Sequence, residues 1–222
     1  MCGRFSFVVE KKKVQKALPN VAIPEETLLT SYNIAPTQLT YVVTNQEPQR
    51  LQKMKWGLVP HWANDDKKGA SLINARMETL TEKPSFKEPL RTQRCLVLAD
   101  SFYEWKTVGG KKIPYRILLQ TEELMFFAGI WDQWHGVNTF SIITTQPNAE
   151  MSVLHNRMPV ILRGVKECGL WLDKTNLDTL LYMCEKPADG FLKTYRVSEK
   201  INSVRNNTSD MHNERPPDLT LF

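Results

Sequence analysis

Residues 101–145 read SFYEWKTVGGKKIPYRILLQTEELMFFAGIWDQWHGVNTFSIITT. This stretch contains short segments that are rich in β-branched and aromatic residues, and turn residues separate them. Such a pattern is typical of β-strands. The pair Gly109-Gly110 stands between the first two segments and predicts a tight hairpin turn, because glycine readily adopts the positive φ values that such a turn requires.

Segments of the same kind lie on both sides of this stretch. We expect strands at 5–9, 39–44, 51–56, 95–99, 101–106, 113–119, 124–131, 139–145, 158–162 and 191–197, and helices at 11–18, 75–81, 148–154, 165–172 and 177–183. Strands and helices do not alternate along the chain, which argues against a doubly wound parallel sheet. The sequence therefore predicts an α+β fold, mostly antiparallel β with a barrel-like core and a few flanking helices.

The composition is that of a globular protein. The chain has 222 residues, of which 41% are hydrophobic and 24% are charged, and these values exclude a disordered, collagen-like or coiled-coil chain. No internal repeat or Ser/Gly-rich linker divides the sequence, so we expect a single domain over residues 1–222. Its polar, proline-bearing tail, residues 206–222, is expected to be loosely ordered.

The sequence also gives an expectation for the compartment. It contains no run of about 18 apolar residues, so no segment is expected to span a membrane. The N-terminal apolar stretch is too short for a secretion signal, and basic residues follow it rather than precede it. We therefore expect a cytoplasmic protein. The four cysteines form no Cys-x-x-Cys pair, so we predict neither a disulfide framework nor a zinc site, and we expect no metal or other cofactor.

The net charge of +5 is unevenly distributed. Residues 1–111 contain 17 Lys and Arg against 11 Asp and Glu, whereas residues 112–222 contain 12 against 13. A basic half can attract an anionic polymer such as nucleic acid. The same imbalance is also ordinary for a protein that simply stays in solution, so charge alone indicates no function.

Cys2 is a candidate nucleophile because removal of Met1 would leave an α-amine and a thiol on the same residue. The ordinary pKa of an α-amine is about 7.7–8.0, so part of it is neutral and nucleophilic near neutral pH. An aldehyde can react with both groups: the amine forms an imine, and the thiol then closes a five-membered thiazolidine in an intramolecular step. The thiol can instead attack a carbonyl, as in N-terminal-nucleophile hydrolases. On position alone, the simpler interpretation is a small residue near a chain end.

Several motifs follow Cys2 in a fixed order. They are CGRF (2–5), YNIAPT (32–37), WGLVPHW (56–62), NARMET (74–79), RCL (94–96), FYEW (102–105) and HNRMP (155–159). With these motifs the chain resembles the SRAP family, the SOS-response-associated peptidases or abasic-site-processing proteins. The resemblance implies binding to single-stranded DNA, and a thiazolidine crosslink between the N-terminal cysteine and the ring-opened aldehyde of an abasic site. The crosslink would shield the lesion during the response to DNA damage.

The resemblance also implies catalytic roles for four residues. Cys2 forms the crosslink, and Asn74 orients its amine or the opened sugar through neutral hydrogen bonds. Glu104, which lies between two aromatic residues, moves protons during imine formation. His155 helps to open the sugar ring. The alternatives from the residues alone are a helix N-cap for Asn74, a solvent-facing strand residue for Glu104 and a packed or surface imidazole for His155.

Five further residues are candidates for contacts with DNA. Arg4, Arg76 and Arg157 flank the catalytic motifs, and guanidinium groups suit backbone phosphates, which an abasic lesion still offers. Trp62 could stack on a base, whereas Trp56 is assigned to packing. Pro36 could wedge against a base where a duplex ends, although a loop proline explains it equally well.

Three other functions compete with this hypothesis. A class II glutamine amidotransferase also begins Met-Cys-Gly, but the sequence has no Asn-Gly-Asp-type segment and no synthase domain. A cysteine peptidase, acting on itself or on other proteins, could use Cys2, His155 and Asn74. A non-covalent module for single-stranded DNA would tolerate the loss of Cys2. We expect a monomer that associates with the nucleoid when bound to DNA.

Overall fold

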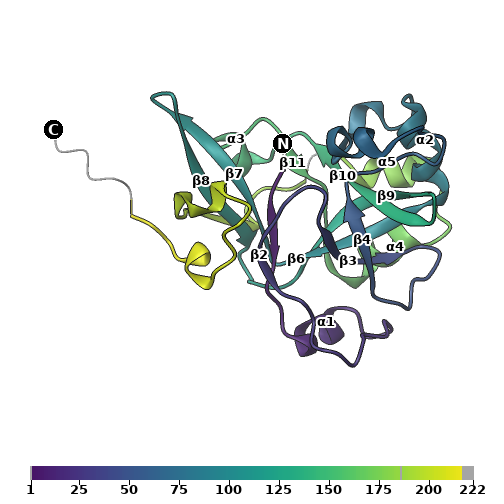
Figure 1. Ribbon diagram of the computed structural model, residues 1–222, viewed down its shortest axis with the longest axis horizontal. Helices are drawn as coiled ribbons and strands as arrows, with labels where there is room; N and C mark the ends of the chain where they lie inside the picture. Colours follow the sequence, from purple (N-terminus) through teal and green to yellow (C-terminus); the bar gives the residue numbers. More distant parts are fainter. Residues whose placement is uncertain (1, 186, 217–222) are drawn as a thin grey trace.

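The computed structural model describes residues 2–185 and 187–216 (Figure 1). Its strands are β1 (Phe5–Phe7), β2 (Ser31–Ile34), β3 (Leu39–Thr44), β4 (Gln52–Trp56), β5 (Asn74–Arg76), β6 (Arg94–Ala99), β7 (Ser101–Val108), β8 (Lys111–Leu119), β9 (Met125–Trp134), β10 (Val137–Thr145), β11 (Met158–Pro159), β12 (Ile161–Leu162) and β13 (Leu192–Arg196). Its helices are α1 (Lys11–Ala17), α2 (Pro84–Thr92), α3 (Ala149–Ser152), α4 (Gly164–Leu172) and α5 (Leu177–Met183), and its short 3₁₀ helices are η1 (Asp66–Ser71), η2 (Met77–Thr79), η3 (Glu199–Asn202) and η4 (Ser209–His212). None of the helices in the described ranges is both long enough and apolar enough to cross a membrane.

Five strands close into a barrel. β4, β3, β6, β9 and β10 follow one another through antiparallel pairings, and β10 returns to β4 through a parallel pairing that sets Phe140 opposite Trp56. Closure pairs the backbone N–H and C=O groups that the edge strands of an open sheet would leave unpaired. The predicted α+β fold, mostly antiparallel and with a barrel-like core, is confirmed.

A second sheet lies beside the barrel, on the left in Figure 1, in the order β13-β8-β7-β1-β2. The two halves meet at Phe5 of β1, whose ring centroid lies 4.9 Å from that of Trp56 and 5.9 Å from that of Phe127. The predicted hairpin turn is confirmed: Gly109 and Gly110 have φ values of +55° and +78° and join β7 directly to β8. This hairpin extends beyond the rest of the sheet at the upper left of Figure 1.

A buried arginine anchors two helices to the barrel, on the right in Figure 1. Arg94, which begins β6, donates hydrogen bonds to the carbonyl oxygens of Leu90 and Arg91 near the end of α2, and of Trp171 and Asp173 at the end of α4, at 2.6–3.0 Å. The carbonyl groups at a helix C-terminus lack partners within the helix and carry the negative end of its dipole. One guanidinium group therefore satisfies the ends of both helices.

The predicted helix at 75–81 is wrong. β5 occupies its beginning, and the 3₁₀ helix η2 follows. Asn74 and Ala75 pair in parallel with Ile142 and Ile143 of β10, and this long-range ladder outweighs the local preference for a helix. The predicted strand at 158–162 is also divided, because β11 pairs with β10 whereas β12 pairs with β9.

The described part of the predicted loose tail, residues 206–216, packs against the second sheet. Met211 is fully buried, and the Oδ1 atom of Asn207 accepts a hydrogen bond from the backbone N–H of Tyr32 at 2.7 Å. An apolar side chain among polar neighbours therefore fixes a segment that composition alone marks as loose. The remainder of the expected tail, residues 217–222, lies outside the described residues.

We predict that Gly129→Ala destabilises the barrel. A Cβ atom at this position of β9 would lie 2.7 Å from the Cys95 Sγ and 3.1 Å from a methyl carbon of Val97. Overpacking of this kind costs about 1–3 kcal/mol of unfolding free energy, which urea denaturation measures. Gly169→Ala on α4 is the matched control, because a Cβ atom there meets nothing within 4 Å, and a stability equal to or above that of the wild type is expected. Equal stabilities for Gly129→Ala and the wild type would contradict the prediction.

Candidate functional site

Cys2 is fully buried at the point where the second sheet meets the barrel. β1 pairs with β7 with Phe5 opposite Phe102, and the N–H of Tyr103 extends this pairing by donating to the carbonyl oxygen of Arg4 at 2.9 Å. The segment that precedes β1 is therefore carried along β7 toward Glu104. The ladder thus brings together two residues that are separated by more than a hundred positions in the sequence.

The environment of Cys2 keeps its thiol protonated. Burial raises the pKa of the Cys2 thiol well above its ordinary value, and the negative charge of Glu104 raises it further. The Sγ atom lies 3.9 Å from the carbonyl oxygen of Arg4, a weak hydrogen bond that opposes the shift only slightly. The sulfur is therefore held as a neutral thiol rather than as a thiolate.

Asn74 holds the main chain of Cys2. Its Nδ2 atom donates to the carbonyl oxygen of Cys2 at 2.8 Å. Its Oδ1 atom is buried and accepts no hydrogen bond from the residues that the structure describes. Because Asn74 lies in β5, the alternative role as a helix N-cap does not apply. The free carbonyl oxygen of this amide is a hydrogen-bond acceptor beside Cys2.

Glu104 and His155 line one cavity of about 520 Å³. Glu104 is buried on β7, with 3% of its surface exposed, and His155 is half-buried in the loop between α3 and β11. The Nδ1 atom of His155 lies 3.0 Å from the backbone nitrogen and 3.3 Å from the carbonyl oxygen of Arg157, so the backbone of Arg157 holds one side of the ring. The catalytic candidates thus form two groups: Asn74 is hydrogen-bonded to Cys2, and Glu104 and His155 line the same cavity. The charge of Glu104 acts on the Cys2 thiol.

Two of the three predicted phosphate-binding arginines make hydrogen bonds within the protein. Arg4 donates from Nη1 to the Oδ1 atom of Asn33 at 2.6 Å and to the carbonyl oxygen of Ile201 at 2.8 Å. Arg157 pairs with Glu78 through both Nη atoms and is largely buried. Arg76 is exposed. The three arginines therefore occupy quite different environments.

The predicted aromatic and proline contacts do not line the cavity of Glu104 and His155. Trp62 is 47% exposed and follows His61, whose ring lies 3.0 Å from a carboxylate oxygen of Asp132 on β9. Pro36 is half-buried between β2 and β3. Trp56 is fully buried, as the assignment to packing predicts.

The cavity is completed by residues that sequence reasoning did not select: Trp105, Thr107, Lys112 and Asn202. Trp105 stands next to Glu104 in a quoted motif, so the sequence offered a signal for it. Lys112 belongs to the hairpin β7–β8, and its register opposite Thr107 could have been counted from the two glycines. Asn202 lies on η3, far along the chain, and no local pattern marks it.

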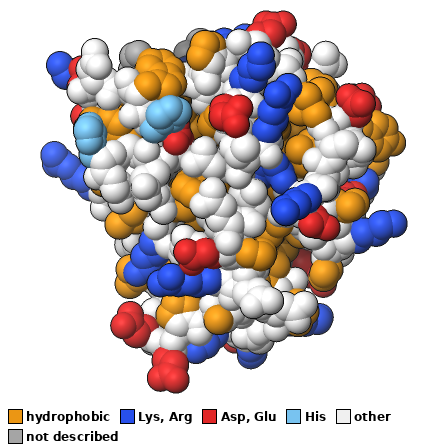
Figure 2. Space-filling view, turned by 90° about the vertical axis from the view of Figure 1, so that its right-hand side faces the viewer, with side chains coloured by type: hydrophobic (Ala, Val, Ile, Leu, Met, Phe, Trp, Pro, Cys, Tyr) orange, Lys and Arg blue, Asp and Glu red, His pale blue; other side chains and the backbone are white. Residues whose placement is uncertain are grey.

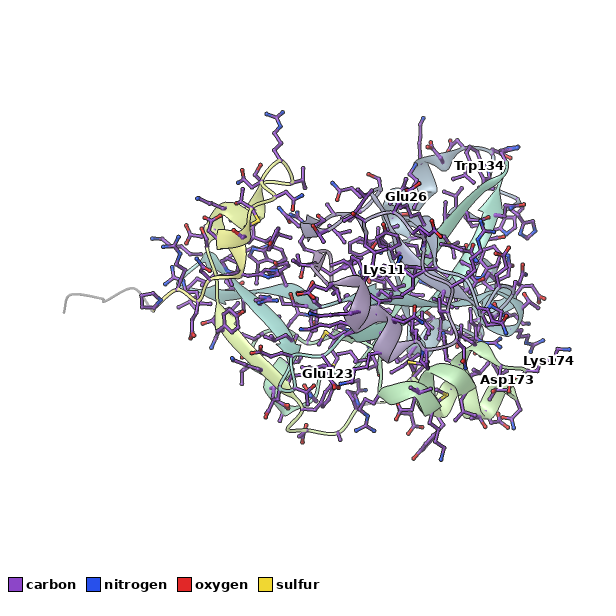
Figure 3. All side chains as sticks on the ribbon, turned by 90° about the horizontal axis from the view of Figure 1, so that it is seen from below. Lys11, Glu26, Glu123, Trp134, Asp173 and Lys174 are labelled. Carbon is purple, nitrogen blue, oxygen red and sulfur yellow. The ribbon has the colours of Figure 1, made fainter. Side chains whose placement is uncertain are left out.

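The described residues contain no cluster of three or more His, Cys, Asp or Glu side chains that could hold a metal ion. On the face shown in Figure 2, Lys and Arg side chains are interspersed with Asp and Glu, so the basic excess forms no uniform patch there. Lys11, Glu26 and Glu123, which are labelled in Figure 3, are exposed, and Asp173 and Lys174 lie next to each other at the right-hand edge of that view.

Residues 1–204 match the family described as SOS response associated peptidase (SRAP). The chain is 41% identical to the abasic site processing protein YoqW of Bacillus subtilis (strain 168), over 95% of this chain and 98% of that protein. It is 36% identical to the abasic site processing protein HMCES of Gallus gallus, over 72% of this chain and 56% of that protein. The crystal structure of a protein from Bacteroides thetaiotaomicron superposes with a TM-score of 0.85 at 26% identity, over 95% of this chain and 99% of that one.

We predict that Glu78→Gln lowers the melting temperature at neutral pH. Hydrogen bonding from Arg157 lowers the pKa of Glu78. The carboxylate therefore stabilises the fold above its ordinary pKa of about 4.3, and this contribution is lost as the pH falls through the lowered value in the folded protein. Because the carboxylate is partly exposed, we expect a loss of about 1 kcal/mol or less.

Thermal unfolding followed by circular dichroism at a series of pH values measures this difference. The melting temperatures of the wild type and Glu78→Gln should converge in acid. Glu88→Gln on α2 serves as the control, since Glu88 is exposed and has no ion pair within the described ranges. A deficit of Glu78→Gln that persists unchanged in acid would contradict the assignment to the Arg157 pair.

Proposed function

Because the chain belongs to the SRAP family, we propose that it processes abasic sites in single-stranded DNA by forming a covalent bond between Cys2 and the lesion. The observation that best supports this proposal is the hydrogen bond from Asn74 to the carbonyl oxygen of the buried Cys2. The charge of Glu104 also acts on the Cys2 thiol and raises its pKa. A residue held in this way can present both its amine and its thiol to one carbon atom. Relatives that share the length of this chain are named abasic site processing proteins.

The proposal requires cleavage of the bond between Met1 and Cys2. Met1 lies outside the described residues. Cleavage converts the N-terminal amide of Cys2 into a primary amine, which is basic enough to be protonated in part and nucleophilic in its neutral form. The buried Oδ1 atom of Asn74 is an acceptor that can orient this amine.

The first chemical step joins the amine to the sugar. His155 donates a proton toward the ring oxygen of the abasic deoxyribose while the C1′ hydroxyl loses its proton, and the open-chain aldehyde results. The neutral Cys2 amine attacks C1′ and forms a carbinolamine. Glu104 takes the surplus proton from nitrogen and returns it to the departing hydroxyl, so that water leaves and an imine remains.

The second step closes the ring. The Cys2 sulfur adds to C1′ of the imine, and the thiol proton passes to the former imine nitrogen, so the thiazolidine forms without any oxidant or cofactor. Amine and thiol belong to one residue, and their proximity makes closure far faster than an intermolecular addition. One aldehyde and one cysteine thus give one thiazolidine and one water.

The protonated thiol favours this order of events over a peptidase. A cysteine peptidase attacks as a thiolate and relies on neighbours that lower the pKa of its cysteine. Burial and Glu104 instead raise the pKa of the Cys2 thiol. An amine-first reaction needs no thiolate, since the sulfur attacks only an activated imine carbon. The family match likewise does not support a glutamine amidotransferase.

We predict that the protein forms a crosslink that survives denaturation with an abasic single-stranded oligonucleotide. A denaturing gel detects the band, and intact mass shows the loss of Met1. Cys2→Ala should give no such band without a reductant but should retain a weaker band when borohydride traps the imine, because the α-amine remains. Cys168→Ala, which alters a buried cysteine on α4, should crosslink like the wild type. Absence of a band with wild-type protein that has lost Met1 would overturn the covalent proposal, and a full band with Cys2→Ala would favour a different nucleophile.

Glu104→Gln should separate binding from chemistry. The substitution keeps the shape of the side chain but removes proton transfer, which contributes roughly a hundred-fold to ten-thousand-fold to a rate. We expect the crosslinking rate to fall by about a hundred-fold or more, while the affinity for an oligonucleotide without a reactive aldehyde stays within about two-fold of that of the wild type. Quenched time courses on a denaturing gel and fluorescence anisotropy measure the two quantities. An unchanged rate would remove Glu104 from the mechanism.

A further inference from the structure

The strand that carries Glu104 has an open edge beside the cavity. β1 pairs with β7 at Phe5 and Ser6, and Arg4 extends the pairing by one hydrogen bond to Tyr103. Beyond that point β7 continues to Val108 and pairs only with β8, within the described residues. The open edge therefore begins beyond the hydrogen bond between Arg4 and Tyr103.

The direction of the main-chain groups on this edge follows from the ladder. The N–H of Tyr103 points toward β1, and side preference alternates along a strand, so the N–H groups of Trp105 and Thr107 point to the same side. Pro114, the residue opposite Trp105 on β8, gives independent support. Its carbonyl oxygen points away from β7 and accepts a hydrogen bond from Val197, so the main-chain groups of this residue pair point outward from the β7–β8 ladder. In the described part of the chain, the N–H groups of Trp105 and Thr107 donate to no other residue.

A lysine stands at the same place. Lys112 lies directly opposite Thr107 in the β7–β8 register, and both line the cavity that contains Glu104 and His155. Lys112 takes part in no ion pair within the described ranges. The neighbouring Lys111 is opposite Val108, and its side chain lies on the other face of the hairpin.

The edge is held in place by the C-terminal segment. The indole N–H of Trp105 donates to the Oδ1 atom of Asn202 on η3 at 2.7 Å. Its ring packs against the small cluster of Tyr103, Val197 and Ile201. Trp105 is thus fixed on one face, so its main chain offers a rigid pair of donors with Thr107.

We propose that the N–H groups of Trp105 and Thr107, together with Lys112, form a subsite for a backbone phosphate of the bound single strand. The inference rests on the proposed function and adds to it the group that positions the strand. Backbone N–H groups and lysine are common partners of phosphate, and they carry no sequence preference. Glu104 lines the same cavity, and repulsion between its carboxylate and a phosphate favours a position of the phosphate beside Lys112.

The proposal also fits the finding that two of the three predicted phosphate-binding arginines are hydrogen-bonded within the protein. Arg4 and Arg157 bond to Asn33 and Glu78 within the protein, and a phosphate would have to displace those partners. Lys112 and the open edge need no such exchange. They also lie on the strand that carries Glu104, so a phosphate held there sets the position of the next sugar relative to the catalytic carboxylate.

The salt dependence of binding tests the subsite. The probe is a mixed-sequence single-stranded oligonucleotide with a tetrahydrofuran abasic analogue, which has no aldehyde, so anisotropy reports equilibrium binding alone. Each phosphate contact on a single strand contributes about 0.7 to the slope of log K against log salt, measured over roughly 50–200 mM. We expect Lys112→Ala to reduce that slope by about 0.7, and Lys111→Ala to leave it unchanged. Equal slopes for the two variants would overturn the inference.

Thr107→Pro tests the main-chain donor. Proline removes an N–H that faces away from β8, so the β7–β8 ladder is retained, and Thr107→Ala controls for the side chain. We expect weaker binding of the same probe by Thr107→Pro only, with an unchanged melting temperature. If Thr107→Pro unfolds, the Lys112 slope still decides the question.

The two proposals fail in different ways. A wild-type protein that crosslinks a true abasic oligonucleotide, but whose slope does not respond to Lys112→Ala, would remove the subsite and leave the covalent function. Conversely, the wild-type protein could lose Met1 and fail to crosslink while Lys112→Ala still reduces the salt slope. That result would remove the covalent step and leave the phosphate subsite.

Discussion

The packing of Phe5 between the two halves of the molecule is the constraint on which the site depends. Its ring meets Trp56 of the barrel edge-on and also contacts Phe127. The first residues of a domain are usually poorly ordered because little holds them. Here an aromatic residue only three positions after Cys2 is fully buried, so the main chain and the thiol of Cys2 are confined by the fold itself. A mobile terminus would leave Cys2 without a fixed position relative to Asn74 and Glu104.

Burial has opposite consequences for the two reactive groups of Cys2. It suppresses ionisation of the thiol, which protects the sulfur from side reactions that require a thiolate. It does not suppress the nucleophilicity of an amine, since desolvation favours the neutral form of a base. In the proposed reaction, the same environment would therefore favour the amine for the first attack and leave the thiol for the second. Both effects follow from the low polarity of the surroundings of Cys2.

The sequence predicts the local features of this fold well and the long-range ones poorly. The Gly109-Gly110 turn and the helix expected at 11–18 depend on near neighbours, and the structure contains both. β5 is a strand only because β10 pairs with it, and nothing local distinguishes Asn74-Ala75 from the start of a helix. The site shows the same limit. The motifs identify Cys2 and Glu104 as candidates, but the internal bonds of the arginines and the contribution of Asn202 depend on chain segments that meet only in three dimensions.

The hydrogen bond between Arg4 and Ile201 spans 197 residues of sequence. Asn33, which also bonds Arg4, reaches on to the carbonyl oxygens of Ser203 and Asn206. During synthesis the segment that contains Arg4 leaves the ribosome long before these partners do. Contacts of such separation form late in folding because a long loop must close first. The geometry around Cys2 is therefore assembled only after the segment from Ile201 to Asn206 has been made, so a chain that stops before this segment would carry the cysteine without the contacts that organise its surroundings.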